Sequence, residues 1–384
     1  MQRNVVILGA TGSIGTSALK VARDIPERMR VVGLAAGTNV LGLTECARTT
    51  GVRHVAIFDA RLADDVRAHL APDVAVGVGE EGLIELATLP EADLVLIAIV
   101  GVAGLRPALA AIEAGKDIAV ASKEILVMAG DVIMEAAHRK KVNVLPVDSE
   151  HNAIFQCLQG VPVEHVRRLI LTASGGPFRT WDAAAIHAAT PAQALKHPTW
   201  DMGQKISIDS ATLFNKGLEM IEARWLFGVG MEKVEVIVHP QSIVHSMIET
   251  VDGSVLAQLS VTDMCFPIQY AVTFPDRVTN SLRPLDFASL ARLDFESPRE
   301  TVFPALRLAR EAGQQGGSLP AVLNAANEVA VSAFLRGNLS FPGIWELVER
   351  VMAAHTVVHG GGLDAACLAD TWARRHAAAW LAQA

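Results

Sequence analysis

The sequence predicts an α/β protein in three parts: a parallel sheet flanked by helices, a central α+β region, and a helical C-terminal region. Short apolar runs alternate with helical patterns over the first 150 residues, as in a doubly wound sheet. A glycine-rich turn joins the first apolar run to the first helical pattern. The last 80 residues have apolar positions at helical spacing.

The glycine turn gives the first domain its specific prediction. Val5–Leu8 is an apolar strand, Gly9-Ala-Thr-Gly-Ser-Ile-Gly15 follows it, and a helical pattern covers Ser17–Arg23. Strand, glycine turn and helix in this order are the context of a dinucleotide-binding fingerprint, in which the helix N-terminus receives the pyrophosphate. The spacing G-x-x-G-x-x-G differs from the commoner G-x-G-x-x-G, and a tight turn without a ligand is the alternative. We predict a Rossmann-like domain.

The loop after the second strand bears on which dinucleotide is bound. The strand Val31–Ala36 ends in Gly37-Thr38-Asn39. An NAD site usually has an acidic residue here to bind the ribose 2′-hydroxyl, and this loop has none. The missing acid favours NADP over NAD, although the loop also contains no Lys or Arg.

Further strand–helix units continue the sheet. Strands are expected at His54–Phe58, Asp93–Ile99 and Asp117–Ala121. Ser122-Lys123-Glu124 follows the last of these, at the sheet edge where ligands bind in open α/β folds. Lys123 and Glu124 are therefore candidate site residues, with an ordinary turn as the alternative.

Carboxylates define a candidate metal site. Asp148 and Glu150 follow an apolar strand, and if the chain stays extended there both side chains leave the same face. Oxygen ligands of this kind suit Mg²⁺ or Mn²⁺, and solvated loop acids are the alternative. Glu219 is the third candidate, on a helix where Asn215 shares its face at i,i+4. We interpret Glu222 as a solvated surface acid.

The stretch His197–Glu219 has the most varied polar groups, including hydroxyl, amide, ammonium, imidazole and carboxylate side chains. It begins as a loop and ends as a helix, and such a mixture could hold a phosphate beside a metal ligand. His239 and His245 could be mistaken for a metal pair. Their surroundings are strand-like, and six strand residues span roughly 20 Å, so we assign both to a sheet.

Composition excludes several classes. The chain has 384 residues, 51% hydrophobic and 19% charged, with a net charge of −8, so neither disorder nor a nucleic-acid surface is expected. The longest apolar run, Leu94–Leu105, is too short for a membrane span of roughly 20 residues. The four scattered cysteines contain no C-x-x-C pair. With an N-terminus that enters a strand directly, they predict a cytoplasmic protein with reduced thiols.

The expected domains are 1–148 for the dinucleotide domain and 149–274 for the central α+β region. A linker at 275–304 and a helical domain at 305–384 complete the chain. Within the last domain we expect helices at Leu319–Leu335, Gly343–Ala354 and Leu363–Leu381. Polar residues of the first, Asn324, Asn327 and Glu328, are interpreted as a helix-end hydrogen-bond network.

At this point several motifs together resemble the 1-deoxy-D-xylulose-5-phosphate reductoisomerase family. They are Gly9–Gly15, Ser122–Glu124, Val147-Asp-Ser-Glu-His-Asn152, Leu171-Thr-Ala-Ser-Gly-Gly-Pro-Phe178, His197–Glu219, Val238-His-Pro-Gln-Ser242 and Leu323-Asn-Ala-Ala-Asn-Glu328. The motifs are in family order over nearly the whole chain. The resemblance implies metal-dependent rearrangement of 1-deoxy-D-xylulose 5-phosphate and reduction by NADPH to 2-C-methyl-D-erythritol 4-phosphate in non-mevalonate isoprenoid synthesis. It also implies a homodimer, in which 149–274 is the catalytic and dimerisation domain and carries a mobile lid at about 174–205.

The resemblance also assigns residues. The metal ligands would be Asp148, Glu150 and Glu219, which with Lys123 form the catalytic set. Substrate would contact Lys123, Ser149, Glu150, Ser174, His197, Trp200, Ser210, Asn215, Lys216 and Glu219. The cofactor would contact Thr11, Gly12, Ser13, Ile14, Gly37, Thr38, Asn39, Ser122, Glu124, Met202 and Gly203. Trp200 and Met202 would belong to the lid. Thr38 replaces a basic residue of many members, Ser122 an Asn and Ala173 a Gly.

Two other functions share part of this pattern. An NADP-dependent semialdehyde or homoserine-type dehydrogenase would have the same glycine turn but needs no acidic metal cluster. Its semialdehyde form would use a reactive cysteine. A non-catalytic NADP-sensing protein would bind the cofactor without turnover and would be indifferent to loss of Glu219.

Overall fold

The computed structural model describes residues 1–200 and 202–383. The chain forms two compact units, and both are built from separate stretches of sequence. Unit 1 contains Met1–Ile125, Val132–Asn152 and Asp263–Arg283. Unit 2 contains Leu126–Asp131, Ala153–Thr262 and Pro284–Ala384.

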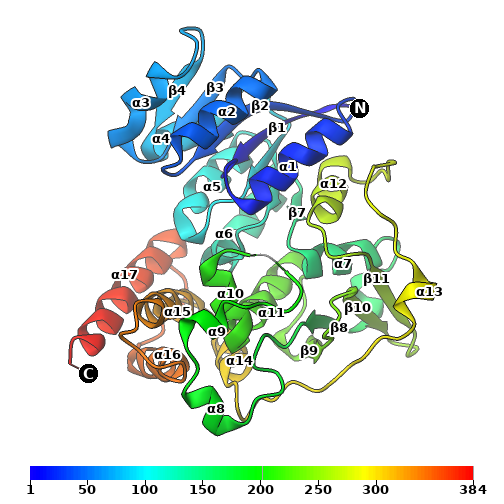
Figure 1. Cartoon of the computed structure of the whole chain (residues 1–384), viewed down its shortest axis with the longest axis vertical. Helices are drawn as coiled ribbons and strands as arrows, with labels where there is room; N and C mark the ends of the chain where they lie inside the picture. Colours follow the sequence, from blue (N-terminus) through cyan, green and yellow to red (C-terminus); the bar gives the residue numbers. More distant parts are fainter. Residues whose placement is uncertain (201, 384) are drawn as a thin grey trace. The chain divides into compact units, whose positions relative to one another are not determined.

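Unit 1 is organised around a seven-stranded sheet in which every strand pair is parallel, in the order β4-β3-β2-β1-β5-β6-β7 (Figure 1). The strands are β1 Arg3–Leu8, β2 Met29–Ala36, β3 His54–Ile57, β4 Ala75–Val78, β5 Leu94–Ile97, β6 Asp117–Val120 and β7 Val144–Pro146. Helices connect them: α1 Ser13–Asp24, α2 Val40–Thr50, α3 Ala63–Ala68, α4 Gly79–Ala87, α5 Leu105–Glu113 and α6 Lys123–Lys140. The α/β prediction for this region is confirmed.

The central strands are buried on both faces. All four residues of β5 are at most 1% exposed, and residues 5–8 of β1 are fully buried. Strands covered by helices on both sides are continuous Val, Ile and Leu runs without alternation.

Two glycines of the first turn are required by packing. Gly9 has φ +104°, and a Cβ there would lie 2.3 Å from the carbonyl oxygen of Ala98. A Cβ on Gly15 would lie 2.3 Å from the carbonyl oxygen of Gly9. Only glycine lets α1 begin so close to β1 and β5.

A late segment of the chain completes unit 1. Helix α12, Cys265–Thr273, packs against α1 and β7. The Cys265 thiol lies 3.7 Å from the carbonyl oxygen of Ser17, and Arg28 forms an ion pair with Asp276 at 2.5 Å.

Unit 2 contains a four-stranded sheet in the order β11-β10-β8-β9. The strands are β8 Val166–Ala173, β9 Val234–Val238, β10 Val244–Thr250 and β11 Val255–Leu259. β8 is antiparallel to β10 and parallel to β9, and β10 and β11 form a hairpin. The predicted Asp252-Gly253 turn closes this hairpin, with Gly253 at φ +85°. Arg168 of β8 binds Glu235 and Glu249 on its two neighbouring strands.

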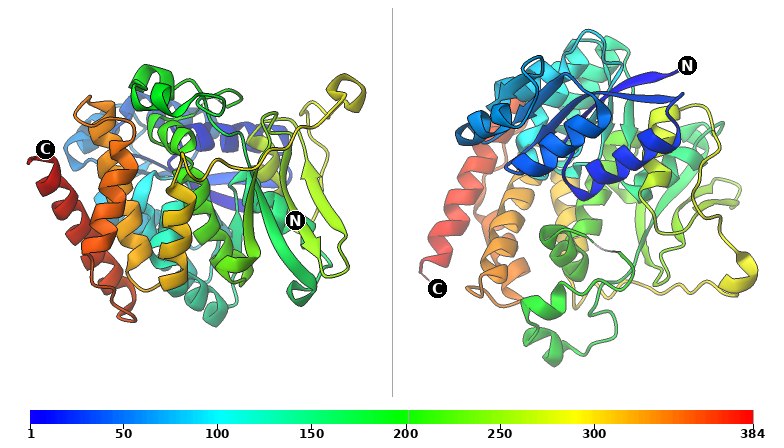
Figure 2. Two further views of the ribbon diagram at one scale, coloured as in Figure 1. Left: turned by 90° about the horizontal axis from the view of Figure 1, so that it is seen from below. Right: turned by 45° about the horizontal axis from the view of Figure 1, so that its top comes forward.

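Helices form the rest of unit 2. α10 Gln204–Thr212 and α11 Phe214–Phe227 follow the short helices α8 Ala183–His187 and α9 Pro191–Ala194. The C-terminal helices are α14 Ala305–Gln315, α15 Leu319–Leu335, α16 Gly343–Ala354 and α17 Gly362–Leu381. α15, α16 and α17 lie side by side in both views of Figure 2 and pack on one another. The predicted helix at 319–335 has the same ends in the structure, as does the one at 343–354. The short α13, Phe287–Leu290, interrupts the otherwise extended segment after residue 284.

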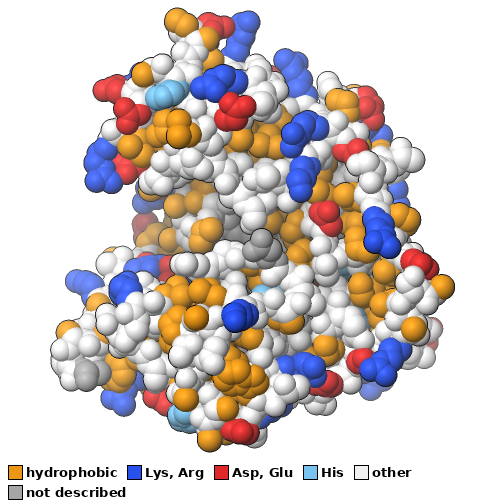
Figure 3. Space-filling view, viewed as in Figure 1, with side chains coloured by type: hydrophobic (Ala, Val, Ile, Leu, Met, Phe, Trp, Pro, Cys, Tyr) orange, Lys and Arg blue, Asp and Glu red, His pale blue; other side chains and the backbone are white. Residues whose placement is uncertain are grey.

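On the face shown in Figure 3, Lys and Arg side chains are interspersed with Asp and Glu, so no basic surface for nucleic acid stands out there. Across residues 1–200 and 202–383, every helix is too short or too polar to cross a lipid bilayer.

Candidate active-site residues

The carboxyl edge of the sheet in unit 1 contains the predicted cofactor residues Thr11–Ile14. Helix α1 begins directly after Gly12, which gives its N-terminus no side-chain cap. A Cβ on Gly12 would come no closer than 3.5 Å to its nearest neighbour. Packing therefore does not require glycine at position 12, in contrast to Gly9 and Gly15. An uncapped N-terminus beside an open glycine is suited to an anion such as a pyrophosphate.

The neighbouring loop Gly37–Asn39 is exposed, as a cofactor loop should be. Asn39 caps α2 by accepting a hydrogen bond from the Gly42 amide at 2.9 Å. The Asp59 amide donates to the Gly37 carbonyl at 3.1 Å, which joins the turn after β3 to this loop. The sequence did not point to Arg61. Its guanidinium binds the Asp59 carboxylate and therefore lies in the turn next to this loop. These hydrogen bonds lower the pKa of Asp59 to about 2, so the pair is ionised at neutral pH.

Ser122 and Glu124 stand at the start of α6, just past β6 as predicted. The Ser122 hydroxyl donates to the Ile99 carbonyl and lies 3.4 Å from that of Ile97. This hydroxyl therefore ties the ends of β5 and β6 together. Glu124, in the first turn of α6, is 7% exposed.

Asp148 and Glu150 lie at the start of helix α7, Ser149–Cys157. The expectation of an extended chain here is wrong, because β7 ends at Pro146 and the Asn152 amide already donates to the Asp148 carbonyl at 2.8 Å. The sequence Asp-Ser-Glu favours a helix N-terminus, where acidic side chains are stabilised by the helix dipole. The two carboxylates thus belong to a first helical turn.

Lys123 reaches this turn within unit 1. Its ammonium contacts the Asp148 carboxylate, and the Lys123 side chain is only 6% exposed. The Ser149 hydroxyl donates to Glu150 at 2.6 Å. A buried lysine is rare unless its charge is paired. Asp148 provides that partner, and the Lys123 ammonium in turn stabilises this acidic turn.

Unit 2 brings together a serine–histidine–serine cluster. Nε2 of His197 lies 2.9 Å from the Ser174 hydroxyl and 3.0 Å from the Ser210 hydroxyl. Nδ1 accepts hydrogen bonds from the backbone amides of Thr199 and Trp200, at 3.3 and 2.9 Å. Because Nδ1 is an acceptor, Nε2 carries the hydrogen in the neutral ring. Two hydroxyls and an N–H group therefore converge, as a phosphate site requires.

Helix α11 supplies the second set in unit 2. The Glu219 side chain is fully buried and accepts hydrogen bonds from Asn215 at 2.6 Å and from Lys216 at 2.5 Å. Leu213, at φ +65°, links α10 to α11 in a left-handed conformation that costs energy for a residue with a side chain. The Glu219 carboxylate is thus held by two donors of its own helix.

Glu222 does not match its prediction. The surface interpretation is wrong, because Glu222 is 1% exposed on the same helix as Glu219. The sequence indicates this burial only weakly: the apolar residues near position 222 surround the whole helix and do not form a single stripe.

His239 and His245 both belong to the sheet region, as expected, but not to one strand. β9 ends at Val238 and β10 starts at Val244, so the estimate of roughly 20 Å for one continuous strand is wrong. His239 contacts the Asp294 carbonyl at 2.8 Å, and His245 contacts the Ser260 hydroxyl at 2.9 Å. Both rings are buried with partners of their own.

The predicted lid residues Trp200 and Met202 are half-buried, and Gly203 is exposed. The Trp200 ring lies 6.3 Å from the His245 ring, and the Thr199 hydroxyl lies 3.1 Å from that of Ser242. Both contacts attach the segment to the start of β10 in this state.

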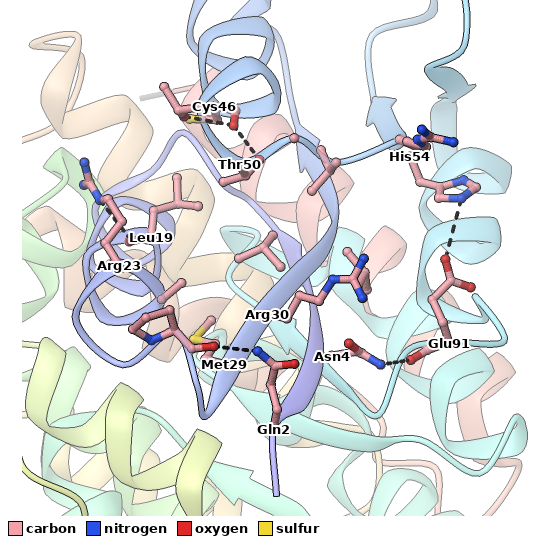
Figure 4. Close-up of a pocket in the computed structure, with 18 of the residues that line it drawn as sticks. Gln2, Asn4, Leu19, Arg23, Met29, Arg30, Cys46, Thr50, His54 and Glu91 are labelled. Carbon is pink, nitrogen blue, oxygen red and sulfur yellow. Dashed lines mark hydrogen bonds and ion pairs between the residues drawn. The ribbon is translucent and has the colours of Figure 1, made fainter.

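A separate pocket of about 850 Å³ lies in unit 1 between α1 and α2, at the amino ends of the first strands (Figure 4). The residues that line it, all in the described part of the chain, include none of the predicted site residues. Its arginines do not converge: Figure 4 shows the side chains of Arg23 and Arg30 pointing apart. The chemistry of its groups therefore makes the carboxyl edge, and not this pocket, the candidate cofactor site of unit 1.

A doubly wound sheet with a glycine turn, together with buried carboxylates and a hydroxyl–imidazole cluster, defines the class of dinucleotide-dependent enzymes that act on phosphorylated or metal-bound substrates. Comparisons with known proteins narrow this class. Three family models match: 1-deoxy-D-xylulose 5-phosphate reductoisomerase at residues 5–130, and two C-terminal domains of the same enzyme at residues 144–227 and 259–376.

Individual relatives agree over almost the full length. The chain is 53% identical to the 1-deoxy-D-xylulose 5-phosphate reductoisomerase of Symbiobacterium thermophilum over 379 residues, and 50% identical to that of Pelotomaculum thermopropionicum over 374, covering 97% of each chain. The solved structure of the Zymomonas mobilis enzyme in complex with NADPH has a TM-score of 0.93, 45% identity and 99% coverage of both chains. A structure of the enzyme with NADPH, fosmidomycin and magnesium has a TM-score of 0.91 and 39% identity, covering 99% of this chain and 98% of that one.

The chain belongs to the 1-deoxy-D-xylulose 5-phosphate reductoisomerase family. The resemblance seen in the sequence motifs is thereby confirmed, as is the fold class that it implied.

The hydrogen bonds of His197 make a testable prediction about its tautomer. In protein with ¹⁵N-labelled histidine at a pH where the ring is neutral, we expect Nε2 of His197 to be protonated and Nδ1 to be bare, because two amides donate to Nδ1. The His197→Gln variant assigns the signal. A spectrum with the proton on Nδ1 would contradict the arrangement described for the cluster.

Proposed function

We propose that this chain converts 1-deoxy-D-xylulose 5-phosphate and NADPH to 2-C-methyl-D-erythritol 4-phosphate and NADP⁺ with a divalent cation, in non-mevalonate isoprenoid synthesis. The observation that carries the proposal is family membership over 97% of the chain at up to 53% identity. The buried Asn215, Lys216 and Glu219 set and the acidic turn of Asp148 and Glu150 supply groups that this reaction needs.

The cation would be held by Asp148, Glu150 and Glu219. Their carboxylates are the hard oxygen ligands that Mg²⁺ and Mn²⁺ prefer, and the Lys123 ammonium on Asp148 shows that this turn accepts positive charge. When bound, the cation polarises substrate oxygens and NADPH supplies the hydride. We propose that Lys123 and these three acids together form the catalytic set.

The phosphate would be held by Ser174, Ser210, Asn215 and Lys216, with His197 donating through Nε2. Two hydroxyls, an amide and an ammonium offer several donors to three phosphate oxygens. Binding energy at the phosphate is distant from the reacting carbons, so it orients the substrate rather than activating it. Trp200 and Met202, beside His197 in sequence, would cover the substrate and exclude water. Ser149 would contact the substrate next to the cation.

NADPH would bind along Thr11–Ile14, Gly37–Asn39, Ser122 and Glu124, with Met202 and Gly203 closing over it. The uncapped start of α1 supports the pyrophosphate end. Thr38 offers no positive charge to the 2′-phosphate. Arg61 is a cation in the adjoining turn, where it binds Asp59, whose amide donates to the Gly37 carbonyl.

The dehydrogenase alternative is not favoured. All three family models and the relatives described above name the reductoisomerase. A reactive cysteine also finds no support at Cys265, because burial raises the pKa of its thiol to about 12, or at Cys46, whose thiol pKa is raised as well.

The metal assignment is tested by Glu150→Gln. NADPH oxidation with 1-deoxy-D-xylulose 5-phosphate should require added Mg²⁺ or Mn²⁺ after EDTA treatment. The variant should lose turnover by roughly 10²-fold or more, since an amide replaces a ligand charge at the cation. NADPH affinity, measured by fluorescence titration, should stay nearly unchanged. Loss of NADPH affinity in step with activity would reject the assignment.

We further propose a cytoplasmic homodimer. β11 is an edge strand, and its hairpin exposes Val251, Val255 and Leu256 at 64%, 51% and 42%. Exposed apolar edges are rare in monomers unless another chain covers them.

Light scattering on a size-exclusion column should therefore give the mass of two chains. The Val255→Asp/Leu256→Asp double variant should elute as a monomer, because it places charge in the covered edge. Leu368→Asp, at a 72% exposed position on α17, is the control and should stay dimeric. A wild-type monomer, or a double variant that remains dimeric, counts against this interface.

A further inference from the structure

Helix α10 carries a buried acid next to a clamp residue. Asp209 is 1% exposed and directly precedes Ser210, whose hydroxyl lies 3.0 Å from Nε2 of His197. An aspartate is almost never buried to this degree unless its charge is paired. The bonds of Asp209 therefore fix how α10 is rotated.

Asp209 has two partners, one near in sequence and one far. Lys205, one turn earlier on α10, forms an ion pair with Oδ2 at 2.7 Å. Asn327 of α15 donates from Nδ2 to Oδ1 at 2.8 Å. The second bond crosses 118 residues of sequence and joins α10 to a helix that packs against α14, α16 and α17.

Asn327 lies in the middle of α15 and not at a helix end. The predicted helix-end network is thus wrong in its location, because α15 runs from Leu319 to Leu335. Asn327 is fully buried, and among the residues that the structure describes its Oδ1 has no hydrogen-bond partner. Burying an amide with half of its capacity unused is costly. Its bond to Asp209 is the polar contact that explains why an amide stands there.

We propose that Asn327 is a positioning residue that acts through Asp209 to set Ser210 in the phosphate clamp. Successive residues of a helix point about 100° apart, so holding Asp209 against α15 fixes the direction of Ser210. The affinity for the phosphorylated substrate depends on this contact, while the chemical step does not. The inference rests on the proposed function, since it takes Ser210 as a phosphate ligand.

The test compares two asparagines of the same helix. Asn327→Leu removes the bond to Asp209. Asn324→Leu is the matched control: Asn324 is also fully buried with an unpartnered Oδ1 among the described residues, but its Nδ2 donates to Glu328 at 3.1 Å. Both variants remove a buried amide from α15, and only one touches α10.

For Asn327→Leu we expect the KM for 1-deoxy-D-xylulose 5-phosphate, and the inhibition constant of inorganic phosphate, to rise about 10-fold, the effect of losing one hydrogen bond to a charged group. kcat should stay within about threefold, as expected when binding is lost equally in the ground and transition states. Asn324→Leu should lower Tm similarly and leave both constants unchanged. If the two variants lower Tm alike and neither raises KM, the contact is merely structural and the proposal is overturned.

Exchanging the donor and the acceptor of the Asp209–Asn327 hydrogen bond gives a second test. This test holds even if Asn327→Leu does not fold. Asn327→Asp places two carboxylates together and should raise KM further than Asn327→Leu. The double variant Asp209→Asn/Asn327→Asp exchanges donor and acceptor and should recover most of the lost affinity. Failure of the double variant to improve on Asn327→Asp would contradict the proposal.

The Ser210→Ala variant tests the phosphate role of Ser210 separately from the positioning role of Asn327. If Ser210→Ala raises KM while Asn327→Leu does not, the clamp stands and the positioning role falls. If Ser210→Ala leaves KM unchanged, the phosphate assignment falls and the positioning role falls with it. Wild-type protein without turnover would instead reject the proposed reaction.

Discussion

The burial of charged side chains is the constraint on which both parts of the site depend. Glu219 is fully buried with Lys216 at 3% exposure, and Lys123 is 5% exposed against Asp148. Removing such charges from water costs several kcal/mol per ion, and replacing a buried pair by apolar residues is often neutral or stabilising. Stability alone therefore does not explain these pairs. The proposed site for a cation, a phosphate and a reacting sugar would explain them, because each ligand needs charge that is already in place and shielded from water.

The two units contribute different chemistry to this account. Unit 1 presents the uncapped start of α1 and the acidic turn at Asp148 and Glu150. Unit 2 presents the hydroxyl–imidazole cluster around His197 and the buried Glu219. Position in the chain does not decide which unit a helix belongs to. Helix α12 belongs to unit 1, although it follows the strands of the unit 2 sheet in the sequence.

Much of the fold follows from local pattern. The glycine turn predicted the first strand–helix unit, because Gly9 and Gly15 occupy positions that exclude a Cβ. The helices at 319–335 and 343–354 followed from apolar spacing and kept their predicted ends. These features depend on neighbours a few residues away, which a sequence displays directly.

The wrong predictions concern residues whose structure depends on distant neighbours or on competing local preferences. Glu222 was assigned to the surface because burial of an acid requires partners that no local pattern shows. The residues at 148–150 were expected to be extended, yet Asp-Ser-Glu also favours a helix start, and the helix formed. Asn327 pairs with Asp209 across 118 residues, which no local motif reveals. The site residues themselves came from residue chemistry joined to the family resemblance, and their roles stay proposals.

The most direct test of the central claim is Mn²⁺ binding, followed by electron paramagnetic resonance, in wild-type protein and in Glu219→Gln. If the buried carboxylate of α11 completes a cation site with the acids of α7, the wild type binds one Mn²⁺ per chain. The variant should bind it at least about 10-fold more weakly. Equal Mn²⁺ affinity in the two proteins would contradict the account, because Glu219 would then be buried for a reason unrelated to the cation.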